Sequence, residues 1–363
     1  MTPDPTYTVR RQRTLVQLLA PGTGGVRDYA ESLSRHWRAS GLEDRLMTIS
    51  QADSQQQVLS SRLQQLIAAE GSPCTMLLHF SGYGFQARGL CFWLLQQIDG
   101  ARQSLGSDLR VVTMFHELFA SGPPWSSAFW LSGLQARIAR HIARRSDAIW
   151  TNTELHRRWL AAQVREIVPV NMQPVFSTIG EPDAVPPAVR RRMQLVVFGA
   201  QSTRHRALAR LPRHTMRLRQ LGVTEVIEVG SGEAYREITS GLGYRFLGRM
   251  DTAALQTLLE SSAYGLIDYP PKYLGKSTVF AAYAVHGCIA LNTADTDCDT
   301  DGLRQGQHFV TLDSAASFTG SIDARQSMAE ATSAWYAGHS SHIQAQAFAE
   351  LCQANNIEET INA

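Results

Sequence analysis

Hydrophobic and polar positions alternate along the chain in two repeating forms. Short apolar runs of strand length lie at 14–20, 45–50, 75–80, 109–115 and 147–151. Each run is followed by a longer segment with apolar residues at helical spacing, at 26–41, 56–71, 90–102, 126–145 and 153–163. Strands that alternate with helices in this way predict a parallel sheet that is covered by helices on both faces.

The pattern stops at 180–192, a polar segment rich in proline that is typical of a linker. It then restarts with strand-like runs at 193–200, 226–230, 245–248, 264–269 and 288–292. Helical segments lie between these runs at 206–222, 253–262 and 277–287, and the tail is helical from about Gln326 onward. The sequence therefore predicts an α/β protein with two Rossmann-like, doubly wound domains, 1–185 and 186–335, that face each other across a cleft.

Composition narrows the class of protein. The chain has 363 residues, 44% hydrophobic and 18% charged, which suits two ordinary cores. A net charge of +2 argues against a general polyanion binder, so no nucleic-acid partner is expected. The five cysteines are odd in number and lack metal-type spacing, which argues against a disulfide framework and a metal site. The N-terminus lacks the apolar core of a signal peptide, and no apolar run reaches the length of a membrane span, so we expect a cytoplasmic protein.

Gly275 to Thr278 read Gly-Lys-Ser-Thr, like the end of a P-loop. The glycine that a P-loop needs five residues earlier is Pro270, which lacks an N–H group. A simpler phosphate site remains compatible with the sequence. Gly275 permits close approach, Lys276 supplies a cation, and a helix that begins near Ser277 offers N–H groups and two hydroxyls. An ordinary capped helix with an exposed lysine explains the same residues, so both interpretations stay open.

A glycine-rich loop, 21–25, follows the first predicted strand. It begins like the dinucleotide fingerprint G-x-G-x-x-G, but the third glycine is replaced by Arg27, which disfavours a nucleotide-dependent oxidoreductase. Gly24 and Gly25 still let a ligand approach the backbone, although for this motif alone a tight turn is the favoured interpretation.

Chemically active side chains follow the central strands of the first domain. His116 and Glu117 come directly after the run 109–115, and His79 lies at the end of the run 75–80. Because ligands of such sheets bind at the carboxyl ends of the strands, these histidines could bind a sugar hydroxyl or transfer a proton. A structural role is the alternative. Tyr83 and Phe85, in the loop after His79, could stack on a sugar face, and Trp125 follows in the loop after Glu117.

Arginines cluster at two places. Arg204 and Arg206 follow the first strand of the second domain, and a guanidinium there could grip phosphate in a bidentate way. We expect one of the two to do so, with a solvated basic face as the alternative. The helix around 134–145 carries an apolar residue at every fourth position beside four arginines. A helix with one face in the core and a solvent-exposed basic face explains this pattern. Docking to anionic lipid headgroups is the second interpretation.

Taken together, these segments resemble the GT-B glycosyltransferases, specifically the retaining group 1 or GT4-like family. The resemblance covers most of the chain and rests on four segments, GTGGVRDYAESLSRHWRASG, FHELFASGPPWSS, SDAIWTNTELHRRWL and DYPPKYLGKSTVFAAYAVHGCIALN. It implies an active site between the two domains, with a UDP- or GDP-linked sugar donor on the second and a glycan or lipid-linked acceptor on the first. It also implies that no metal or other cofactor is required, and that a helical tail, 336–363, packs back on the first domain.

The resemblance carries over directly to Gly24 and Gly25, to His116 and to Gly275–Thr278. The other candidates come from the residues themselves. Together, the predicted catalytic residues are His116, Glu117 and Lys276. The predicted donor-binding residues are Gly24, Gly25, Arg204, Arg206, Tyr269, Gly275, Ser277 and Thr278. The predicted acceptor-binding residues are His79, Tyr83 and Trp125. The family's two glutamates fall at Leu274 and Ala282, so neither carboxylate exists at these positions.

The predicted function is a glycosyltransferase that acts in polysaccharide or glycoconjugate assembly, retaining and independent of metal. It is expected in the cytoplasm, with peripheral contact at the inner face of the membrane through the basic helix 134–145 as a further hypothesis. Because the two glutamates are missing, a catalytically inactive nucleotide-sugar-binding subunit is the alternative.

Overall fold

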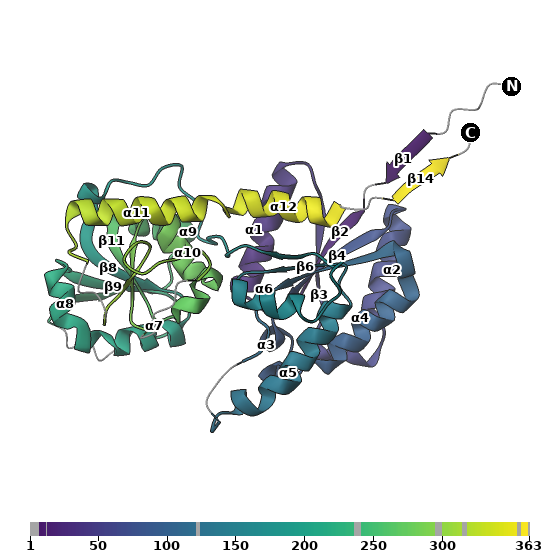
Figure 1. Ribbon diagram of the computed structural model, residues 1–363, viewed down its shortest axis with the longest axis horizontal. Coiled ribbons are helices and arrows are strands. Elements are labelled where there is room, and N and C mark those ends of the chain that lie inside the picture. The colour runs from purple at the N-terminus through teal and green to yellow at the C-terminus, as the bar shows by residue number, and fades with distance from the viewer. Residues whose placement is uncertain are drawn as a thin grey trace. The chain divides into compact units, whose positions relative to one another are not determined.

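The computed structural model describes residues 7–11, 13–120, 124–235, 241–294, 300–313, 318–353 and 357–361. The chain divides into two compact units (Figure 1). Unit 1 comprises residues 1–173 and 341–363, and unit 2 comprises residues 174–340. Each unit is described by itself.

Unit 1 is built on six parallel strands. They are β2 (Thr14–Leu19), β3 (Asp44–Thr48), β4 (Cys74–Phe80), β5 (Leu109–Phe115), β6 (Ala148–Thr151) and β7 (Val170–Met172). The helices between them are α1 (Gly25–Ala39), α2 (Val58–Glu70), α3 (Gly82–Phe85), α4 (Phe92–Leu105), α5 (Ser127–Arg144) and α6 (Glu154–Ala161). The strand order is β3-β2-β4-β5-β6-β7, and every pairing is parallel. This is the doubly wound arrangement that the strand and helix periodicity predicts.

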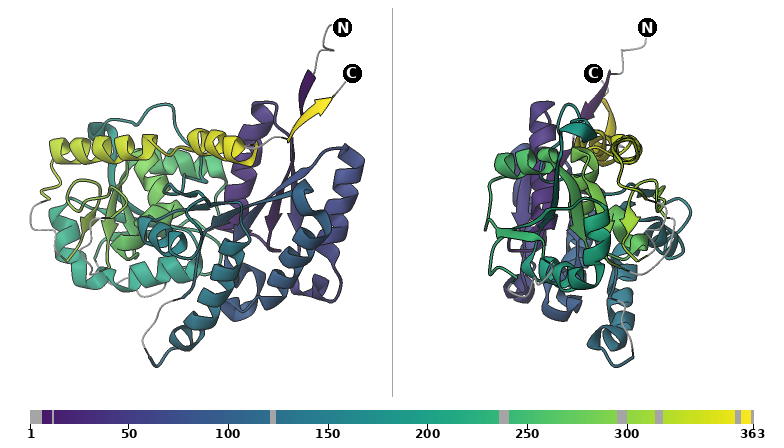
Figure 2. Two further views of the ribbon diagram at one scale, coloured as in Figure 1. Left: turned by 45° about the vertical axis from the view of Figure 1, so that its right-hand side comes forward. Right: turned by 90° about the vertical axis from the view of Figure 1, so that its left-hand side faces the viewer.

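The central strands of unit 1 are buried except for the partly exposed Thr14 and Arg110, as near-continuous apolar runs predict for a parallel sheet. Helices α2, α4 and α5 pack side by side, and α1 packs against α12 (Ser341–Gln353) (Figures 1 and 2). The last helix therefore belongs to unit 1, although it follows the whole of unit 2 in the sequence.

Specific contacts hold α12 on unit 1. The Trp37 indole donates a hydrogen bond to the carbonyl of Ala345 at 2.7 Å, and Thr75 Oγ1 donates to the carbonyl of Cys352 at 2.9 Å. The ring of Phe348 lies 4.5 Å from that of Trp150, centroid to centroid. Because Phe348 and Cys352 are completely buried, α12 completes the core of unit 1.

Two short strands near the ends of the sequence have no counterpart among the predicted runs, and neither do the sheet strands β7 and β13 (Val310–Thr311). Strands β1 (Tyr7–Arg11) and β14 (Ile357–Ile361) pair antiparallel as a separate two-stranded ribbon. The pairing joins segments near the two ends of the sequence, and such a long-range pairing has no local signal.

Unit 2 is a second six-stranded parallel sheet. Its strands are β8 (Arg192–Phe198), β9 (Glu225–Val229), β10 (Gly243–Phe246), β11 (Ser262–Ile267), β12 (Ile289–Asn292) and β13 (Val310–Thr311). Its helices are α7 (Gln201–Ala209), α8 (Thr215–Gln220), α9 (Thr252–Ser261), α10 (Thr278–His286) and α11 (Ile322–Ala337). The order is β10-β9-β8-β11-β12-β13, again with parallel pairings throughout. The predicted fold class, with two Rossmann-like domains, is confirmed.

Two details of unit 2 differ from the sequence prediction. The single helix predicted at 206–222 is divided into α7, the 3-10 turn Leu211–His214 and α8. Pro212 lies in that turn, and a proline without an N–H group interrupts the helical hydrogen bonds. The second difference is the start of the unit at Pro174, before the proline-rich segment. The Val175 amide donates to the carbonyl of Gly275 at 2.7 Å, and the Ser177 amide donates to Tyr336 Oη at 2.7 Å, so this stretch is tied to unit 2.

Buried histidines should make the protein sensitive to acid. Burial lowers the pKa of His286, lowers that of His339 to about 4, and, together with the neighbouring His116, holds that of His79 well below its ordinary value. Below pH 6.5 these histidines therefore bind protons in the unfolded chain but stay neutral in the folded chain. The free energy of unfolding should fall as the pH falls from 6.5 toward 5. Each histidine contributes at most about 1.4 kcal/mol per pH unit.

Urea unfolding at pH 7.0 and pH 5.2 measures this difference. The variant His339→Gln should show a smaller loss between the two pH values, whereas His342→Gln, at an exposed position, should behave like the parent protein. Equal losses in the parent protein and in His339→Gln would contradict the assignment.

Candidate functional site

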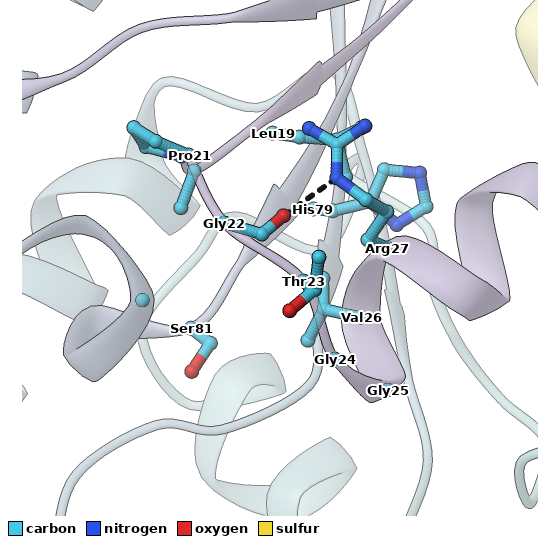
Figure 3. A pocket seen from close by; sticks show the side chains of 12 residues that line it. Leu19, Pro21, Gly22, Thr23, Gly24, Gly25, Val26, Arg27, His79 and Ser81 are labelled. Carbon is cyan, nitrogen blue, oxygen red and sulfur yellow. Dashed lines mark hydrogen bonds between the residues drawn. The ribbon is translucent and has the colours of Figure 1, made fainter.

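The strand order of unit 1 changes direction between β2 and β4. From β2 the chain moves outward to β3, whereas from β4 it moves the other way through β5, β6 and β7. The connections that follow β2 and β4 therefore run over opposite faces of the sheet. Between them lies a crevice at the carboxyl ends of these strands, where such folds bind ligands. A cavity of about 170 Å³ lies there, lined by Leu19–Arg27, His79, Ser81 and Gly84 (Figure 3).

The glycine-rich loop forms one wall of this cavity. Gly22 and Gly24 have φ angles of 107° and 136°, values that residues with a Cβ atom rarely adopt. Helix α1 begins at Gly25, and no side chain caps its N-terminus. A Cβ atom on Gly24 or Gly25 would find no atom within 4 Å, so the space beside the backbone is open. Arg27 Nε donates to the carbonyl of Gly22 at 2.7 Å and so holds the loop in this shape.

The two histidines predicted for the site lie against each other. His79 Nδ1 is 3.1 Å from His116 Nε2, and the two rings stack with centroids 5.4 Å apart. His79, the last residue but one of β4, lines the cavity. His116 is buried behind it and is not a lining residue, and its amide donates to the carbonyl of Phe80 at 3.0 Å. The ring of Tyr29 from α1 stands edge-on to His116 at 5.1 Å. The pair is thus held by the sheet on one side and by α1 on the other.

A hydrogen-bond chain determines which nitrogen of each ring carries a proton. Gln17 Nε2 donates to Asp44 Oδ2 at 2.7 Å and to the carbonyl of Ala30 at 3.1 Å, so Gln17 Oε1 is the atom that faces His79 Nε2, at 2.7 Å. His79 Nε2 must therefore donate, which leaves His79 Nδ1 as the acceptor for the Nε2–H of His116. Because the pKa of His79 is strongly lowered, by burial first and by His116 second, His79 stays neutral and keeps this acceptor.

The other predicted residues of unit 1 lie around this pair in different environments. The carboxylate of Glu117 accepts a hydrogen bond from Ser81 Oγ at 3.1 Å. Ser81 lines the cavity, whereas Glu117 does not. Phe85, also expected to stack on a sugar, is buried. Tyr83 is exposed, and its hydroxyl accepts from Gln135 Nε2 of α5 at 3.2 Å. Trp125 is exposed in the turn before α5. The cavity is lined by neither of these two aromatic residues.

Unit 2 has its own change of direction, between β8 and β11. The loop after β11 begins with Asp268, and α7 begins shortly after β8. Arg206 Nε donates to Asp268 Oδ2 at 2.6 Å, and Arg210 Nη1 lies 2.9 Å from Asp268 Oδ1. This ion-paired group joins the two connections at the crevice, so Arg206 lies at the position where the fold predicts a ligand.

Arg204 has a different environment from Arg206. Its side chain is completely buried and donates to Glu228 Oε1 at 2.8 Å, to the carbonyl of Gly199 at 2.6 Å and to that of Ser231 at 3.0 Å. Glu228 also accepts from the Tyr244 hydroxyl at 2.5 Å. Burial opposes the charge on Glu228, but these hydrogen bonds outweigh it and lower the pKa of the carboxyl group. Arg204 therefore acts as an internal tie of unit 2, whereas Arg206 remains half exposed.

The Gly-Lys-Ser-Thr stretch joins a 3-10 turn, Pro271–Lys276, to α10. Ser277 is the N-cap of α10, as the sequence predicts, and its Oγ accepts from the amide of Phe280 at 3.2 Å. The ammonium groups of Lys272 and Lys276 each lie 5.2 Å from the centroid of the Tyr273 ring. A cation and the N-terminus of a nine-residue helix therefore lie together in the connection that follows β11.

Neighbouring positions explain the rest of this loop. The side chain of Asn292 accepts from the Tyr269 amide at 3.1 Å and donates to the Tyr269 carbonyl at 2.7 Å, which holds the turn after β11. Leu274 and Ala282, where the resemblance places glutamates, are buried in the hydrophobic core. In the described parts of the chain, no group of three His, Cys, Asp or Glu side chains is arranged to hold a metal ion.

Three members of the site were not identified from the sequence, namely Gln17, Asp44 and Asp268. Gln17 carries the only readable signal, because an amide in the middle of an apolar strand run requires a buried partner. Asp44 and Asp268 stand at strand boundaries, where acids are common, so no local pattern distinguishes them.

The fold can be compared with solved structures. The structure of trehalose-6-phosphate from E. coli bound with UDP-2-fluoro glucose has a TM-score of 0.60 at 11% identity, over 94% of this chain and 99% of that chain. The UDP-forming α,α-trehalose-phosphate synthase of Burkholderia xenovorans has a TM-score of 0.58 at 12% identity, over 95% and 99%. An alpha-glucosyltransferase in complex with UDP has a TM-score of 0.57 at 11% identity, over 94% and 100%. No family model and no curated protein matches the sequence.

These likenesses extend over almost the entire chain, and they show the fold. The protein has the two Rossmann-like domains of the GT-B glycosyltransferases. Identities of 11–12% leave the chemistry to be argued from the residues of the two crevices.

Proposed function

We propose that the protein transfers a glycosyl group from a UDP-linked sugar to a hydroxyl acceptor. The observation that carries this proposal is the oriented His79–His116 pair beside an open glycine loop, at the crevice of unit 1. The comparisons support the donor class, because the similar proteins were solved with UDP or a UDP-sugar. The same comparisons favour UDP over GDP, the other donor that the sequence left open.

The reaction needs a site that receives negative charge. As the bond from the anomeric carbon to the diphosphate oxygen breaks, the electron pair stays on the leaving UDP, and a new bond forms to the acceptor oxygen. We assign stabilisation of the diphosphate to Lys276, to the N-terminus of α10 at Ser277 and Thr278, and to Arg206, since fixed cations and dipoles lower the energy of a developing anion. Gly275 and Tyr269 belong to the same loop. These groups carry the positive charge that a divalent ion supplies in other enzymes, and on this basis we propose a metal-independent reaction.

His116 is the residue that we assign to the sugar side. With its Nε2–H given to His79, the ring has one orientation and one tautomer, so it is ready to hold a sugar hydroxyl or to move its proton. Glu117 and the glycines Gly24 and Gly25 line the approach to the reacting groups. Retention of configuration, the GT4-like grouping and a role in polysaccharide or glycoconjugate assembly in the cytoplasm complete the proposal.

Lys276 can be tested against a matched neighbour. Lys272 lies at the same distance from Tyr273 but one turn earlier, so Lys272→Ala removes an equal charge outside the assigned site. We expect UDP to raise the melting temperature of the parent protein and of Lys272→Ala, and to raise that of Lys276→Ala less. Loss of a charge-assisted hydrogen bond of about 1.5–3 kcal/mol should lower kcat/KM for transfer about 10- to 100-fold. Unchanged activity in Lys276→Ala would refute the charge assignment.

The same measurements test the function itself. Release of UDP from UDP-sugars, followed with and without glycan or lipid-linked acceptors, reports turnover, and the melting shift reports binding. Binding with no turnover against any acceptor would favour the inactive binding subunit, for which the core residues Leu274 and Ala282 are the motivating observation. Absence of any shift with UDP, GDP and their sugars would exclude both.

A further inference from the structure

Helix α5 has an apolar face of which only the C-terminal half is buried in the core. Toward its C-terminal end, Ile138 and Ile142 are completely buried, as a core-facing helix requires. One turn earlier Leu134 is 37% exposed, and a further turn earlier Trp130 is 73% exposed. In Figures 1 and 2 this N-terminal part of α5 extends away from the sheet of unit 1. The core-facing interpretation of the sequence therefore holds only for the second half of the helix.

Three exposed aromatic side chains lie at, or just before, the N-terminal end of α5. Trp125, in the turn before α5, is 87% exposed, and Phe129 is 44% exposed with its ring 5.4 Å from that of Trp130. We call Trp125, Phe129 and Trp130 the aromatic end. Indole rings are costly to leave in water and are rarely exposed to this degree together, so such a group marks an interaction surface.

Arginines continue along the same exposed face. At 100° per residue, Arg137, Arg140 and Arg144 project within about 100° of each other and on the side that carries Phe129 and Trp130. The helix contains neither aspartate nor glutamate. Among the described residues, none of the three arginines forms an ion pair with a carboxylate, although Arg140 and Arg144 donate to Gln163. The chain as a whole has a charge of only +2, so this basic face is a local feature.

We propose that the aromatic end and these three arginines form a docking surface for an anionic lipid bilayer. Tryptophan rings prefer the boundary between headgroups and acyl chains, while arginines beside them attract anionic headgroups. The charge decides between occupants, because a neutral glycan would use the indole rings without the arginines, and a second copy of the chain would place equal charges against each other. No helix in the described ranges has the length and hydropathy to cross a bilayer.

Vesicle binding by the purified full-length protein tests the surface without reference to glycosyl transfer. We expect co-sedimentation with vesicles of phosphatidylcholine and 30% phosphatidylglycerol, weaker binding to pure phosphatidylcholine, and loss of binding with added salt. The triple variant Arg137→Gln, Arg140→Gln, Arg144→Gln should bind the anionic vesicles about a hundredfold more weakly. A matched triple variant, Arg45→Gln, Arg158→Gln, Arg245→Gln, removes the same charge from exposed positions elsewhere and should bind like the parent protein.

The aromatic end needs its own readout. Brominated lipids should quench tryptophan fluorescence in the parent protein, and the variant Trp125→Phe, Trp130→Phe should lose that quenching while it still binds. A circular-dichroism melt confirms that each variant is folded. The proposal is overturned if anionic vesicles do not bind, or if both arginine variants bind equally. It is also overturned if light scattering shows a dimer that depends on Trp125 and Trp130, or if a soluble glycan protects these residues while vesicles do not.

Discussion

Replacing His116 with alanine should lower kcat/KM for glycosyl transfer by about 10²- to 10⁴-fold, the usual contribution of a positioned acid or base. The reason is the geometry around the ring, which is held by His79 at 3.1 Å and by Tyr29 edge-on at 5.1 Å. The shift in melting temperature with UDP should change little, because the assigned diphosphate groups belong to unit 2. Nearly full activity in His116→Ala would contradict the role of this residue.

The hydrogen bonds from His116 to His79 and from His79 to Gln17 allow a second test of this role. Gln17→Leu removes the acceptor of the His79 Nε2 proton, so His79 can change tautomer and the acceptor for His116 is no longer secured. We expect a smaller loss of kcat/KM than in His116→Ala and a changed pH profile. Nitrogen NMR of the imidazoles should show the Nε2–H form of His116 in the parent protein and a mixture in Gln17→Leu. Finding the Nδ1–H form of His116 in the parent protein would show that His116 Nε2 does not donate to His79.

Replacing Arg204 with alanine should lower the free energy of unfolding of unit 2 by about 3–5 kcal/mol, because it leaves the buried carboxylate of Glu228 without its charged partner. The double variant Arg204→Met, Glu228→Leu should recover much of this loss, since removing both charges also removes the cost of burying them. Urea unfolding measures the three proteins. Arg206→Ala is the control, as its half-exposed guanidinium should matter little to stability.

The same variants separate the two predicted roles of the arginines. If Arg204 bound the nucleotide, Arg204→Ala would remain stable and lose the melting shift with UDP. We expect the reverse, with the loss of UDP affinity in Arg206→Ala. Stable Arg204→Ala protein that no longer binds UDP would overturn the structural assignment of Arg204.

Local patterns were sufficient to predict much of this protein. The alternation of apolar runs and amphipathic segments predicts two parallel sheets, because a strand buried on both faces and a helix buried on one have different periods. The cap at Ser277 was also readable, since a hydroxyl before an apolar helix satisfies its amides. The His79 and His116 positions followed from the rule that active side chains stand at the carboxyl ends of strands.

Other features had no local signal. The contact of His79 with Gln17 and His116, and that of Arg204 with Glu228, join residues 24 to 62 positions apart, so only the sheet order brings them together. Arg204 and Arg206 looked equivalent in the sequence. Two residues apart on a helix, they point in different directions, one into unit 2 and one toward the crevice.

The sequence by itself determined the fold class. The spacing of apolar residues decides which segments can bury apolar area as strands and which as helices, and that spacing can be read directly from the sequence. Only the tertiary structure decided which charged and polar groups are accessible. That depends on where the core ends, as the two halves of α5 demonstrate. The same fourfold spacing buries Ile138 and leaves Trp130 exposed, because only the second half of the helix packs into the core of unit 1.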